Sequence, residues 1–471
     1  MAGVTHTRAI HIFRRDLRLV DNTALSRAVR ESAEVIPVFI FDEAQRDPMR
    51  NPYFSERAFA FMCRSLEELQ EELHGAGSAL RVFSGDPIEV VRTLIARDHV
   101  DAVYVNGDYT PFARTRDAAL ERVCREHNAA FVRCEDAALS PVCDIRTQGG
   151  VPYTVFTPFF RNAAQSPVAL PRRAPRVPPL SAHLHTPHRA LHDATNDVSV
   201  DLSHMPAGRE AGRKVLRAHA WLAGYAQRRD APAVVGTSRL SPHHKFGTVS
   251  IRESFAVANR AGTHDAAKFV AELYWRDFYY HIAWHFPQVF GKSFLPWGEH
   301  IEWRNNRQEF DAWRAGRTGV PIVDAGMREL NTTGWMHNRV RMIVASFLTK
   351  NLLIDWRWGE RYFATQLVDY DPAQNNGGWQ WSASVGADPR PLRIFNPYMQ
   401  AQKYDPSAEY IKAWLPELRD VETALLVDGR ERDLSACVKG YPAPIVSARE
   451  SYHRAREVYR AAKDSSTSAA T

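Results

Sequence analysis

Short apolar runs alternate with amphipathic helical stretches over residues 1–140. The runs, each short enough for one buried strand, are Ala9–Phe13, Val35–Phe41, Leu80–Phe83, Val103–Val105 and Phe131–Val132. The helical stretches between them include Tyr53–His74, Pro87–Ala96 and Ala113–His127. Strands and helices that alternate at this spacing form a parallel sheet with helices on both faces. We therefore predict a Rossmann-like α/β domain with a five-stranded parallel sheet over residues 1–140.

The pattern changes at Pro141. Ten of the 28 prolines fall within residues 141–206, and no apolar period is sustained there. Proline fixes φ and has no N–H to donate, so it interrupts regular helices. We interpret residues 141–206 as a proline-rich connector that runs over the surface without regular helix.

Helical periodicity dominates residues 207–462. Apolar positions recur near every 3.6 residues in His264–His285, Val323–Leu330, Trp335–Leu348 and Ala408–Leu415. This pattern predicts an all-α carboxyl-terminal domain. The last residues, 463–471, are small and polar, which is typical of a flexible tail.

Composition and charge narrow the class of protein. A chain of 471 residues with 45% apolar and 24% charged residues is expected to fold into two or three globular domains. No apolar run approaches the roughly 20 residues of a membrane helix, and no secretory signal opens the chain. Five scattered cysteines without a C-x-x-C motif favour a reducing compartment and argue against structural zinc. His281 and His285 are one helical turn apart, but Ile282 stands where a zincin helix has Glu, so no metal site is expected.

The net charge is compatible with two kinds of surface, and the tryptophans are unevenly distributed along the chain. A charge of +6 fits either a polyanionic partner or a solvated basic surface. All twelve tryptophans lie between Trp221 and Trp414. The two halves of the chain are therefore built differently.

The segment 271–285 combines aromatic and charged residues on one predicted helix face. Glu272, Trp275, Arg276 and Tyr279 are spaced i, i+3, i+4 and i+7. This face suits a pocket that stacks a planar ligand and hydrogen-bonds its edge. The alternative is an ion pair between Glu272 and Arg276 beside two buried rings.

The segment 331–347 offers a polar face on a second predicted helix. Asn338, Arg341, Met342 and Ala345 share this face, and the spacing turns Arg339 away from it. An amide and a thioether flanked by arginines can read a base edge while the cations hold phosphate. The alternative is a core helix filled by methionine, with solvated arginines.

The segment 368–397 contains closely spaced carboxylates and glycines. Asp369, Asp371 and the pair Gly377–Gly378 predict a loop whose backbone closely approaches a ligand. A glycosidase-like carboxylate pair is the alternative, although a two-residue spacing disfavours the 5 to 9 Å separation that such a pair needs.

Three hydroxyl side chains precede a predicted helix near residue 241. Thr237, Ser238 and Ser241 form either a phosphate cradle or ordinary helix caps. No G-x-G-x-x-G loop, P-loop or G-x-S-x-G motif occurs in the chain.

Taken together, these segments resemble the cryptochrome/photolyase family, and most closely the class I cyclobutane pyrimidine dimer DNA photolyases of microbes. The stretches that carry the resemblance are Phe13–Leu25, Gly236–Gly247, Glu272–His281, Thr318–Phe363, Asn375–Trp381 and Arg393–Pro397. The resemblance implies an amino-terminal antenna-binding α/β domain and a helical domain that binds FAD.

The resemblance also implies a set of FAD contacts. These are Tyr225, Thr237, Ser238, Arg239, Leu240, Ser241, Glu272, Arg276, Asp369, Tyr370, Asp371 and Asn375. Asn375 corresponds to the position next to flavin N5, where an Asn is more typical of photolyases than of animal or plant cryptochromes. Tyr370 departs from the Gly of many relatives and is expected to alter the adenine side of the site.

The lesion pocket implied by the family consists of Glu272, Trp275, Asn338, Met342 and Trp381. Its expected chemistry is electron transfer from photoexcited, fully reduced flavin to the dimer, ring splitting, and return of the electron. Glu272 would bind the thymine carbonyl edge, and both tryptophans would stack on the flipped-out dimer. Asn338 and Met342 stand where six-four photolyases have His, which favours a cyclobutane substrate.

Further roles follow from the same resemblance. Trp379, Trp356 and Trp303 match an electron chain that leads from the flavin to the surface. The expected DNA contacts are Arg229, Glu272, Trp275, Arg276, Tyr279, Asn338, Arg339 and Arg393, of which the arginines would hold phosphates. UV-damaged DNA is thus the expected partner of a cytoplasmic, nucleoid-associated monomer. A cryptochrome-type blue-light photoreceptor with little or no repair activity is the alternative.

A second, antenna chromophore is expected in the amino-terminal domain. Asp108, Arg116 and Lys245 resemble the pocket of relatives that bind 8-hydroxy-5-deazaflavin. Thr110 departs from those relatives, which have Glu. Methenyltetrahydrofolate is the alternative, although this chain lacks the Asn-Glu pair of folate-type relatives.

Overall fold

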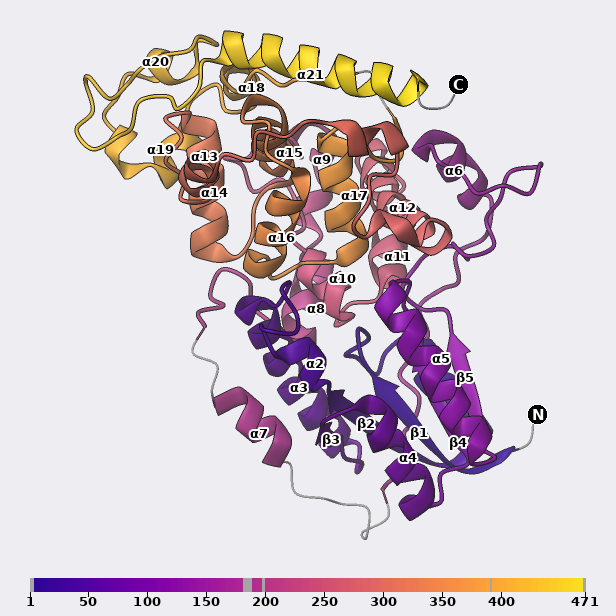
Figure 1. Ribbon diagram of the computed structural model, residues 1–471. Coiled ribbons are helices and arrows are strands. Elements are labelled where there is room, and N and C mark those ends of the chain that lie inside the picture. The colour runs from indigo at the N-terminus through magenta and orange to yellow at the C-terminus, as the bar shows by residue number, and fades with distance from the viewer. Residues whose placement is uncertain (1–3, 181–188, 197–199, 390–391, 469–471) are drawn as a thin grey trace.

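A five-stranded parallel sheet forms the amino-terminal half of the molecule (Figure 1). The structure is a computed structural model that describes residues 4–180, 189–196, 200–389 and 392–468. The strands are β1 (His6–Phe13), β2 (Ser32–Phe41), β3 (Arg81–Ser84), β4 (Ala102–Asn106) and β5 (Ala130–Cys134), in the order β3-β2-β1-β4-β5. All four neighbouring pairs are parallel, which confirms the predicted sheet.

Alternating side chains of the central strands enter two separate cores, one on each face of the sheet. On one face, residues such as Phe13 and Phe39 pack with apolar residues of α1 (Thr23–Glu31) and α3 (Glu56–Gly75). On the other, residues such as Ile12 and Val38 pack with α4 (Pro87–Asp98) and α5 (Pro111–Glu126). Because both faces are buried, the strands are continuously apolar, which is why their sequence pattern is so clear.

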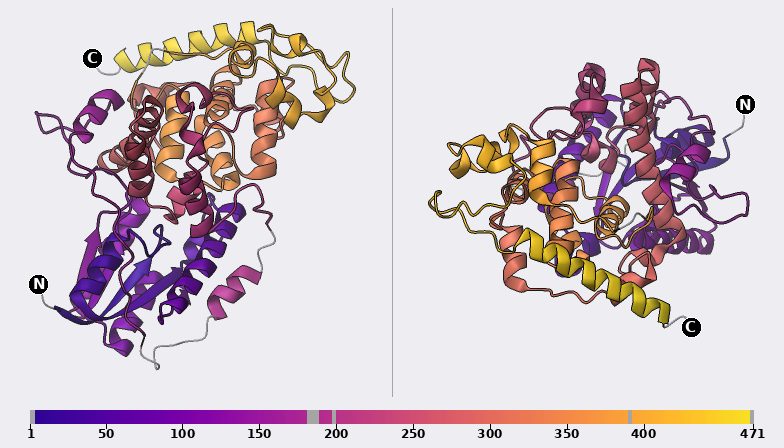
Figure 2. Two further views of the ribbon diagram at one scale, coloured as in Figure 1. Left: turned by 180° about the vertical axis from the view of Figure 1, so that it is seen from behind. Right: turned by 90° about the horizontal axis from the view of Figure 1, so that it is seen from above.

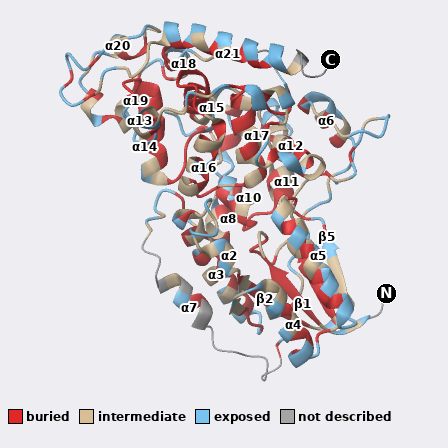
Figure 3. Ribbon diagram, in the orientation of Figure 1, coloured by how far each residue is buried: buried red, intermediate tan, exposed pale blue. Residues whose placement is uncertain are grey.

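Helices form the second half of the molecule, above the sheet domain in Figure 1. They are α8 (Arg209–Ala218), η2 (Ala220–Leu222), α9 (Tyr225–Arg228), α10 (Ser241–Phe246), α11 (Ile251–Ala261), α12 (His264–His285), η3 (Pro287–Val289), η4 (Pro296–His300), α13 (Arg307–Arg314), α14 (Pro321–Thr333), α15 (Asn338–Ser346), η5 (Phe347–Asn351), α16 (Trp356–Gln366), α17 (Pro372–Ser382), α18 (Pro397–Tyr404), α19 (Glu409–Trp414), η6 (Pro416–Leu418), α20 (Thr423–Val427) and α21 (Ala448–Ser468). The largest buried core lies among α13 to α21, as the red segments of Figure 3 show.

Helix α15 begins three residues later than the apolar spacing predicts. Gly334 has φ +71° and ends α14, because a left-handed residue cannot continue a right-handed helix. The side chain of His337 then caps α15 by accepting a hydrogen bond from the backbone N–H of Arg339. The predicted window 335–348 therefore covers the cap, α15 and the start of the π-helical turn η5.

The connector contains two helices, contrary to the prediction that its prolines forbid them. In α6 (Phe156–Ala163), Pro158 lies in the first turn, where its missing N–H breaks no helical hydrogen bond. Phe159 is fully buried against α12. Helix α7 (Arg189–Asn196) contains no proline and packs on α3 and β3, outside the sheet domain (Figures 1 and 2).

Two further expectations are wrong. Residues 463–468 continue helix α21 and are not a flexible tail, since Tyr459 and Ala462 anchor the preceding turn in the core. Residues 469–471 lie outside the described residues. Gly377 and Gly378 lie inside helix α17 and not in a loop.

Buried charges join the two halves. Arg252 of α11 binds Asp21 at 2.8 Å and Asp136 at 2.7 Å. Both carboxylates belong to the sheet domain, because Asp21 lies between β1 and α1 and Asp136 follows β5. Arg18 adds a second guanidinium to Asp136 at 2.5 Å. Breaking such a pair would leave an uncompensated buried charge, so these contacts hold the domains in one orientation.

Candidate functional site

A cavity of about 530 Å³ opens inside the helical half. It lies between α10, α12, α15 and α17, and its lining includes segments 237–241 and 369–371. The predicted site residues that line it are Tyr225, Arg229, Thr237, Ser238, Arg239, Leu240, Ser241, Glu272, Trp275, Arg276, Tyr279, Asn338, Arg339, Met342, Asp369, Tyr370, Asp371, Asn375, Trp379 and Trp381. Segments that are far apart in the chain, from Tyr225 to Trp381, thus meet at one hollow, whereas Trp303, Trp356 and Arg393 lie outside it.

The hydroxyl groups of Thr237, Ser238 and Ser241 do not cap helix α10. The residue before this helix is Leu240, and no side chain caps the helix. Ser238 Oγ accepts a hydrogen bond from the Leu240 N–H at 3.3 Å, which tightens the turn itself. Arg239 has φ +51° and places its guanidinium 4.6 Å from the ring centre of Trp335. These hydroxyls and this cation face a cavity, as an anion-binding wall requires.

The two carboxylates near α17 are held by different partners. Asp369 Oδ2 accepts a hydrogen bond from Arg341 Nη2 at 2.8 Å, while its Oδ1 is buried without a protein partner. Asp371 caps α17 and pairs with Arg15 of the sheet domain and with the Tyr280 hydroxyl. Although burial opposes ionisation, Arg15 holds the pKa of Asp371 below its usual value. The unpartnered Asp369 oxygen is therefore an acceptor available to a bound ligand.

Glu272 pairs with Arg229 and not with Arg276. The Glu272 Oε1 to Arg229 Nη1 distance is 2.5 Å. Arg276 instead donates to the backbone carbonyls of Ala137 and, at 3.3 Å, His244. The ion pair within α12 that the helical spacing allowed is thus wrong. The residue that follows α9 brings a nearer guanidinium to Glu272, and carbonyl oxygens of the sheet domain and of α10 bind Arg276 instead.

Trp275 has one covered ring face. Phe156 of α6 stacks on it with 3.8 Å between ring centres and 7° between planes. Sequence reasoning missed Phe156, whose only signal is the aromatic cluster FTPFF inside the connector. The second face of the indole remains for a planar ligand in the cavity.

Helix α15 presents Asn338, Met342 and also Arg339 to the cavity. Helical spacing predicted that Arg339 points away from that face. Its guanidinium nevertheless extends to Asp230, at 2.8 Å, and to the ring centre of Tyr404, at 4.4 Å. Asn338 Nδ2 lies 3.9 Å from Met342 Sδ. The length of the arginine side chain, which helical spacing ignores, explains this difference.

Asn375 is oriented by a buried acid that sequence reasoning missed. Its Nδ2 donates to the Glu360 carbonyl oxygen at 3.0 Å and to Glu360 Oε1 at 3.3 Å. Burial raises the pKa of Glu360 to about 7. A titratable carboxyl therefore lies directly behind the amide that lines the cavity.

The three tryptophans of the predicted electron chain occupy one aromatic core. Trp379 lies in the cavity wall, with its ring edge-on to Phe363 at 4.9 Å. Trp356 is buried, and its Nε1 has no hydrogen-bond partner among the described residues. Trp303 is partly buried and lies edge-on to Tyr459 at 6.2 Å. Trp313, which the pattern did not single out, is 6.1 Å from Trp379.

A second cavity, of about 630 Å³, lies between the two halves. Its lining contains all three predicted antenna residues, Asp108, Arg116 and Lys245. Seven Lys or Arg side chains line it against three Asp or Glu side chains, together with many aromatic rings. Burial and the nearby Arg15 lower the pKa of Lys245 to about 8. Tyr370 lines both cavities and stands between them.

Among the described residues, no helix is long and apolar enough to cross a membrane, and no cluster of His, Cys, Asp and Glu is able to hold a metal ion. The five cysteines are all free.

Comparison with known proteins identifies the family. Residues 9–179 match the model for DNA photolyase, and residues 269–461 match that for the FAD binding domain of DNA photolyase. A deoxyribodipyrimidine photo-lyase of a Synechococcus strain is 39% identical over 455 residues, which cover 92% of each chain. The crystal structure of a Sulfolobus tokodaii photolyase with two FAD molecules is 43% identical, with a TM-score of 0.87 over 96% of this chain and 100% of that one. A class III photolyase of Agrobacterium tumefaciens is 35% identical, with a TM-score of 0.89 over 98% and 99%. The chain therefore belongs to the DNA photolyase family.

Proposed function

We propose that this chain repairs UV-damaged DNA in light, using reduced FAD in the helical cavity to split cyclobutane pyrimidine dimers. Light-dependent DNA repair is the activity of the family to which the chain belongs. The observation that carries the proposal is that cofactor-type and lesion-type residues share one cavity whose wall contains Trp379.

The residues of the cavity fit FAD. The hydroxyls of Thr237, Ser238 and Ser241 suit a pyrophosphate, and the unpartnered Asp369 Oδ1 suits a ribitol hydroxyl or a ring N–H. Asn375, oriented by Glu360, would hold the flavin at N5. When bound in its reduced form and excited by light, FAD supplies one electron to the dimer and accepts it back.

The lesion side of the cavity would bind the flipped-out dimer. A carboxylate paired with a guanidinium acts as a hydrogen-bond acceptor, so Glu272 suits the ring N–H groups of the pyrimidines and not the carbonyl edge that the resemblance implied. The Asn338 amide is able to donate to the carbonyl oxygens, where negative charge develops. Trp275, backed by Phe156, and Trp381 offer ring faces to the two bases.

The aromatic core would return the flavin to its reduced form. Trp379 lines the cavity, Trp356 is buried in the same core, and Trp303 is only partly buried at its edge. Transient oxidation passed along these indoles would carry the electron deficit to the surface, where a reductant in solution would supply the missing electron. The lesion pocket is what favours repair over a photoreceptor function, since signalling needs the flavin and the relay alone.

The second cavity would hold an antenna chromophore. Its surplus of cations and its aromatic rings suit a planar heterocycle with an anionic tail. We favour 8-hydroxy-5-deazaflavin over methenyltetrahydrofolate, held by Asp108, Arg116 and Lys245. A second flavin nucleotide is chemically similar, and the Sulfolobus tokodaii relative is described with two FAD molecules. Mass spectrometry of the extracted chromophores identifies the ligand.

The class I assignment, the monomeric state and the cytoplasmic, nucleoid-associated location belong to the same proposal. Asn338 and Met342 in the cavity wall support a cyclobutane substrate. The net charge of +6 supports association with DNA.

The test is repair of a defined lesion. FAD-loaded, chemically reduced protein is mixed with an oligonucleotide that contains one cyclobutane dimer, and the loss of dimer under blue light is followed by chromatography. Repair is expected in light, none is expected in the dark, and a six-four lesion should persist. Protein that binds the dimer but leaves it intact in light would refute the proposal.

A further inference from the structure

The two tryptophans of the lesion site belong to elements that are far apart in the chain. Trp275 lies in α12 and Trp381 lies in α17, and both line the cavity of about 530 Å³. Stacking requires direct contact between ring faces, so the spacing of the two indoles decides whether both bases of a dimer are covered at once. Residues that fix this spacing therefore bear on recognition of the lesion.

Residues 382–389 fold back on the end of α17, directly after Trp381. The Ser384 N–H donates to the carbonyl oxygen of Trp381 at 3.0 Å, and the Val385 N–H donates to that of the residue before it, also at 3.0 Å. A Cβ on Gly386 would lie 2.8 Å from the backbone nitrogen of Trp381, a distance that only glycine avoids. The segment is thus packed tightly against the residue that carries the indole, so a contact that fixes the segment also fixes Trp381.

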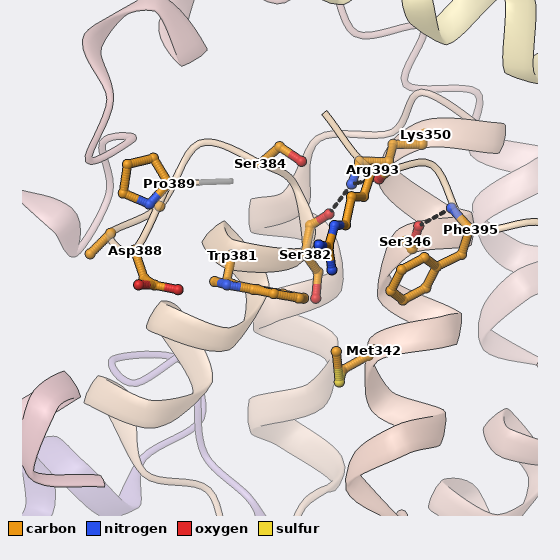
Figure 4. Close-up of a pocket in the computed structure, with 12 residues that line it drawn as sticks. Met342, Ser346, Lys350, Trp381, Ser382, Ser384, Asp388, Pro389, Arg393 and Phe395 are labelled. Carbon is orange, nitrogen blue, oxygen red and sulfur yellow. Dashed lines mark hydrogen bonds between the residues drawn. The ribbon is translucent and has the colours of Figure 1, made fainter. Parts of the chain in front are cut away.

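Lys350 ties this segment to the helical core. It lies in the π-helical turn η5 and is 2% exposed. Its ammonium donates to the carbonyl oxygens of Ser382 at 2.6 Å and of Arg393 at 2.5 Å, beside a small pocket that Trp381 and Met342 also line (Figure 4). Among the described residues, no carboxylate forms an ion pair with it. The buried ammonium is therefore satisfied through the backbone on either side of the pocket, which holds the residue after Trp381 in place.

Asp388 ties the same segment to α6. It is 2% exposed, its N–H donates to the Thr154 carbonyl oxygen at 2.8 Å, and its Oδ1 accepts from the Phe156 N–H at 3.1 Å. Phe156 begins α6, and the residue before it makes no side-chain cap, so the distant carboxylate satisfies the open helix end. The φ of Asp388 is +55°, a conformation that a residue other than glycine keeps only when its surroundings hold it.

These contacts lead to both indoles of the lesion site. Phe156 stacks on Trp275 with 3.8 Å between ring centres, so Asp388 acts on Trp275 through α6. Lys350 acts on Trp381 through the adjoining carbonyl group. We propose that Asp388 and Lys350 are positioning residues, which together hold the two ring faces at the spacing that a flipped-out dimer requires. Neither side chain lines the cavity itself. The inference rests on the proposed repair function and adds to it the residues that shape its lesion pocket.

The first test compares Asp388→Ala with Asp324→Ala. Asp324 is a matched control, because it is fully buried, accepts from the backbone N–H groups of Thr318 at 2.7 Å and Gly319 at 3.0 Å, and lines neither ligand cavity. Binding of a duplex with one dimer, and of the same duplex without it, is measured in the dark by fluorescence anisotropy. Asp388→Ala should lose about tenfold in affinity for the dimer, the effect of losing one stacked base, and keep its affinity for undamaged DNA. Asp388→Asn retains an acceptor oxygen and should restore dimer binding, and Asp324→Ala should keep both affinities.

A second set of variants leaves Asp388 in place. Phe156→Leu removes the flat ring behind Trp275, whereas Phe160→Leu makes the same change one turn further along α6. Phe156→Leu should lose affinity for the dimer alone, and Phe160→Leu should bind like the wild type. Lys350→Met keeps the length of the side chain but donates no hydrogen bond, so it should lose affinity for the dimer as Phe156→Leu does.

The outcomes separate a positioning role from general stability. Equal losses for dimer and undamaged DNA, or a loss in Asp324→Ala as large as that in Asp388→Ala, would overturn the inference. So would unchanged dimer binding by both Asp388→Ala and Lys350→Met. If the wild type itself showed no preference for the duplex with the dimer, the result would instead count against the proposed function.

Discussion

The double glycine of α17 offers a stringent test of how the cavity is built. A Cβ on Gly377 would overlap the Tyr279 ring, with even Cγ only 2.9 Å away. A Cβ on Gly378 would meet no heavy atom within 4 Å and would enter the cavity that this residue lines. Two neighbouring glycines thus have opposite reasons to be small: one lets α17 pack closely on α12, and the other leaves room for a ligand.

The expected magnitudes follow from this geometry. Replacing Gly by Ala inside a helix gains about 1 kcal/mol of stability at either position. At Gly377 an overpacking cost of about 1–3 kcal/mol opposes this gain, because the ring of Tyr279 must move. The propensity gain is the same for both variants, so the difference in their unfolding free energies, about 1–3 kcal/mol, measures the contact with Tyr279 alone.

The assay is urea unfolding of FAD-free Gly377→Ala and Gly378→Ala, followed by tryptophan fluorescence. Bound FAD would add its own binding free energy to the measured stability, so it is removed first. Gly378→Ala should be as stable as the wild type or more so, but should retain less FAD on purification. Equal unfolding free energies for the two variants would refute the close packing of α17 on α12.

Three further predictions concern other parts of the molecule. Trp379→Phe should slow flavin photoreduction at least tenfold in transient absorption, because Phe is far harder to oxidise, while chemically reduced protein still repairs; an equal loss of repair would contradict the relay role. Tyr370→Gly should lower the ratio of second chromophore to FAD in the absorbance spectrum, since it removes the wall between the cavities that stacks on Tyr53, and Tyr370→Phe should restore it. Burial raises the pKa of Asp277 to about 7, so its contribution to stability is complete below about pH 4 and is lost as the pH rises towards 7. Asp277→Asn should flatten this decline in unfolding free energy between pH 5 and 7, and an unchanged slope would show that Asp277 is ionised in the folded protein throughout.

Local patterns predicted the elements well where one physical rule dominates. The strands of the sheet are buried on both faces, so their apolar runs stand out, and the period of 264–285 coincides with α12. Local patterns failed where the decisive contact is distant. Proline-rich residues 141–206 form α6 because Phe159 is buried against α12, which no local period reveals.

The chemistry of the site was readable from residue types, because carboxylate, indole, amide and hydroxyl groups cluster in four segments of the chain. The interaction partner of each site residue could not be predicted from the sequence. Helical spacing relates a residue only to others of its own helix, so it predicted Arg276 as the possible ion-pair partner of Glu272. The observed partner is Arg229, which the packing of α9 on α12 brings close. The same reason explains why Phe156 behind Trp275 and Glu360 behind Asn375 were missed.

By itself, the sequence determined the α/β and helical halves, the candidate residues and the family resemblance, because these depend on local periodicity and on residue identity. Only the tertiary structure decided which candidates share a cavity and that Tyr370 lies in the wall of both cavities. The physical reason is that these features arise from long-range packing, in which burial and ion pairing between distant segments select one arrangement among many that the local pattern allows.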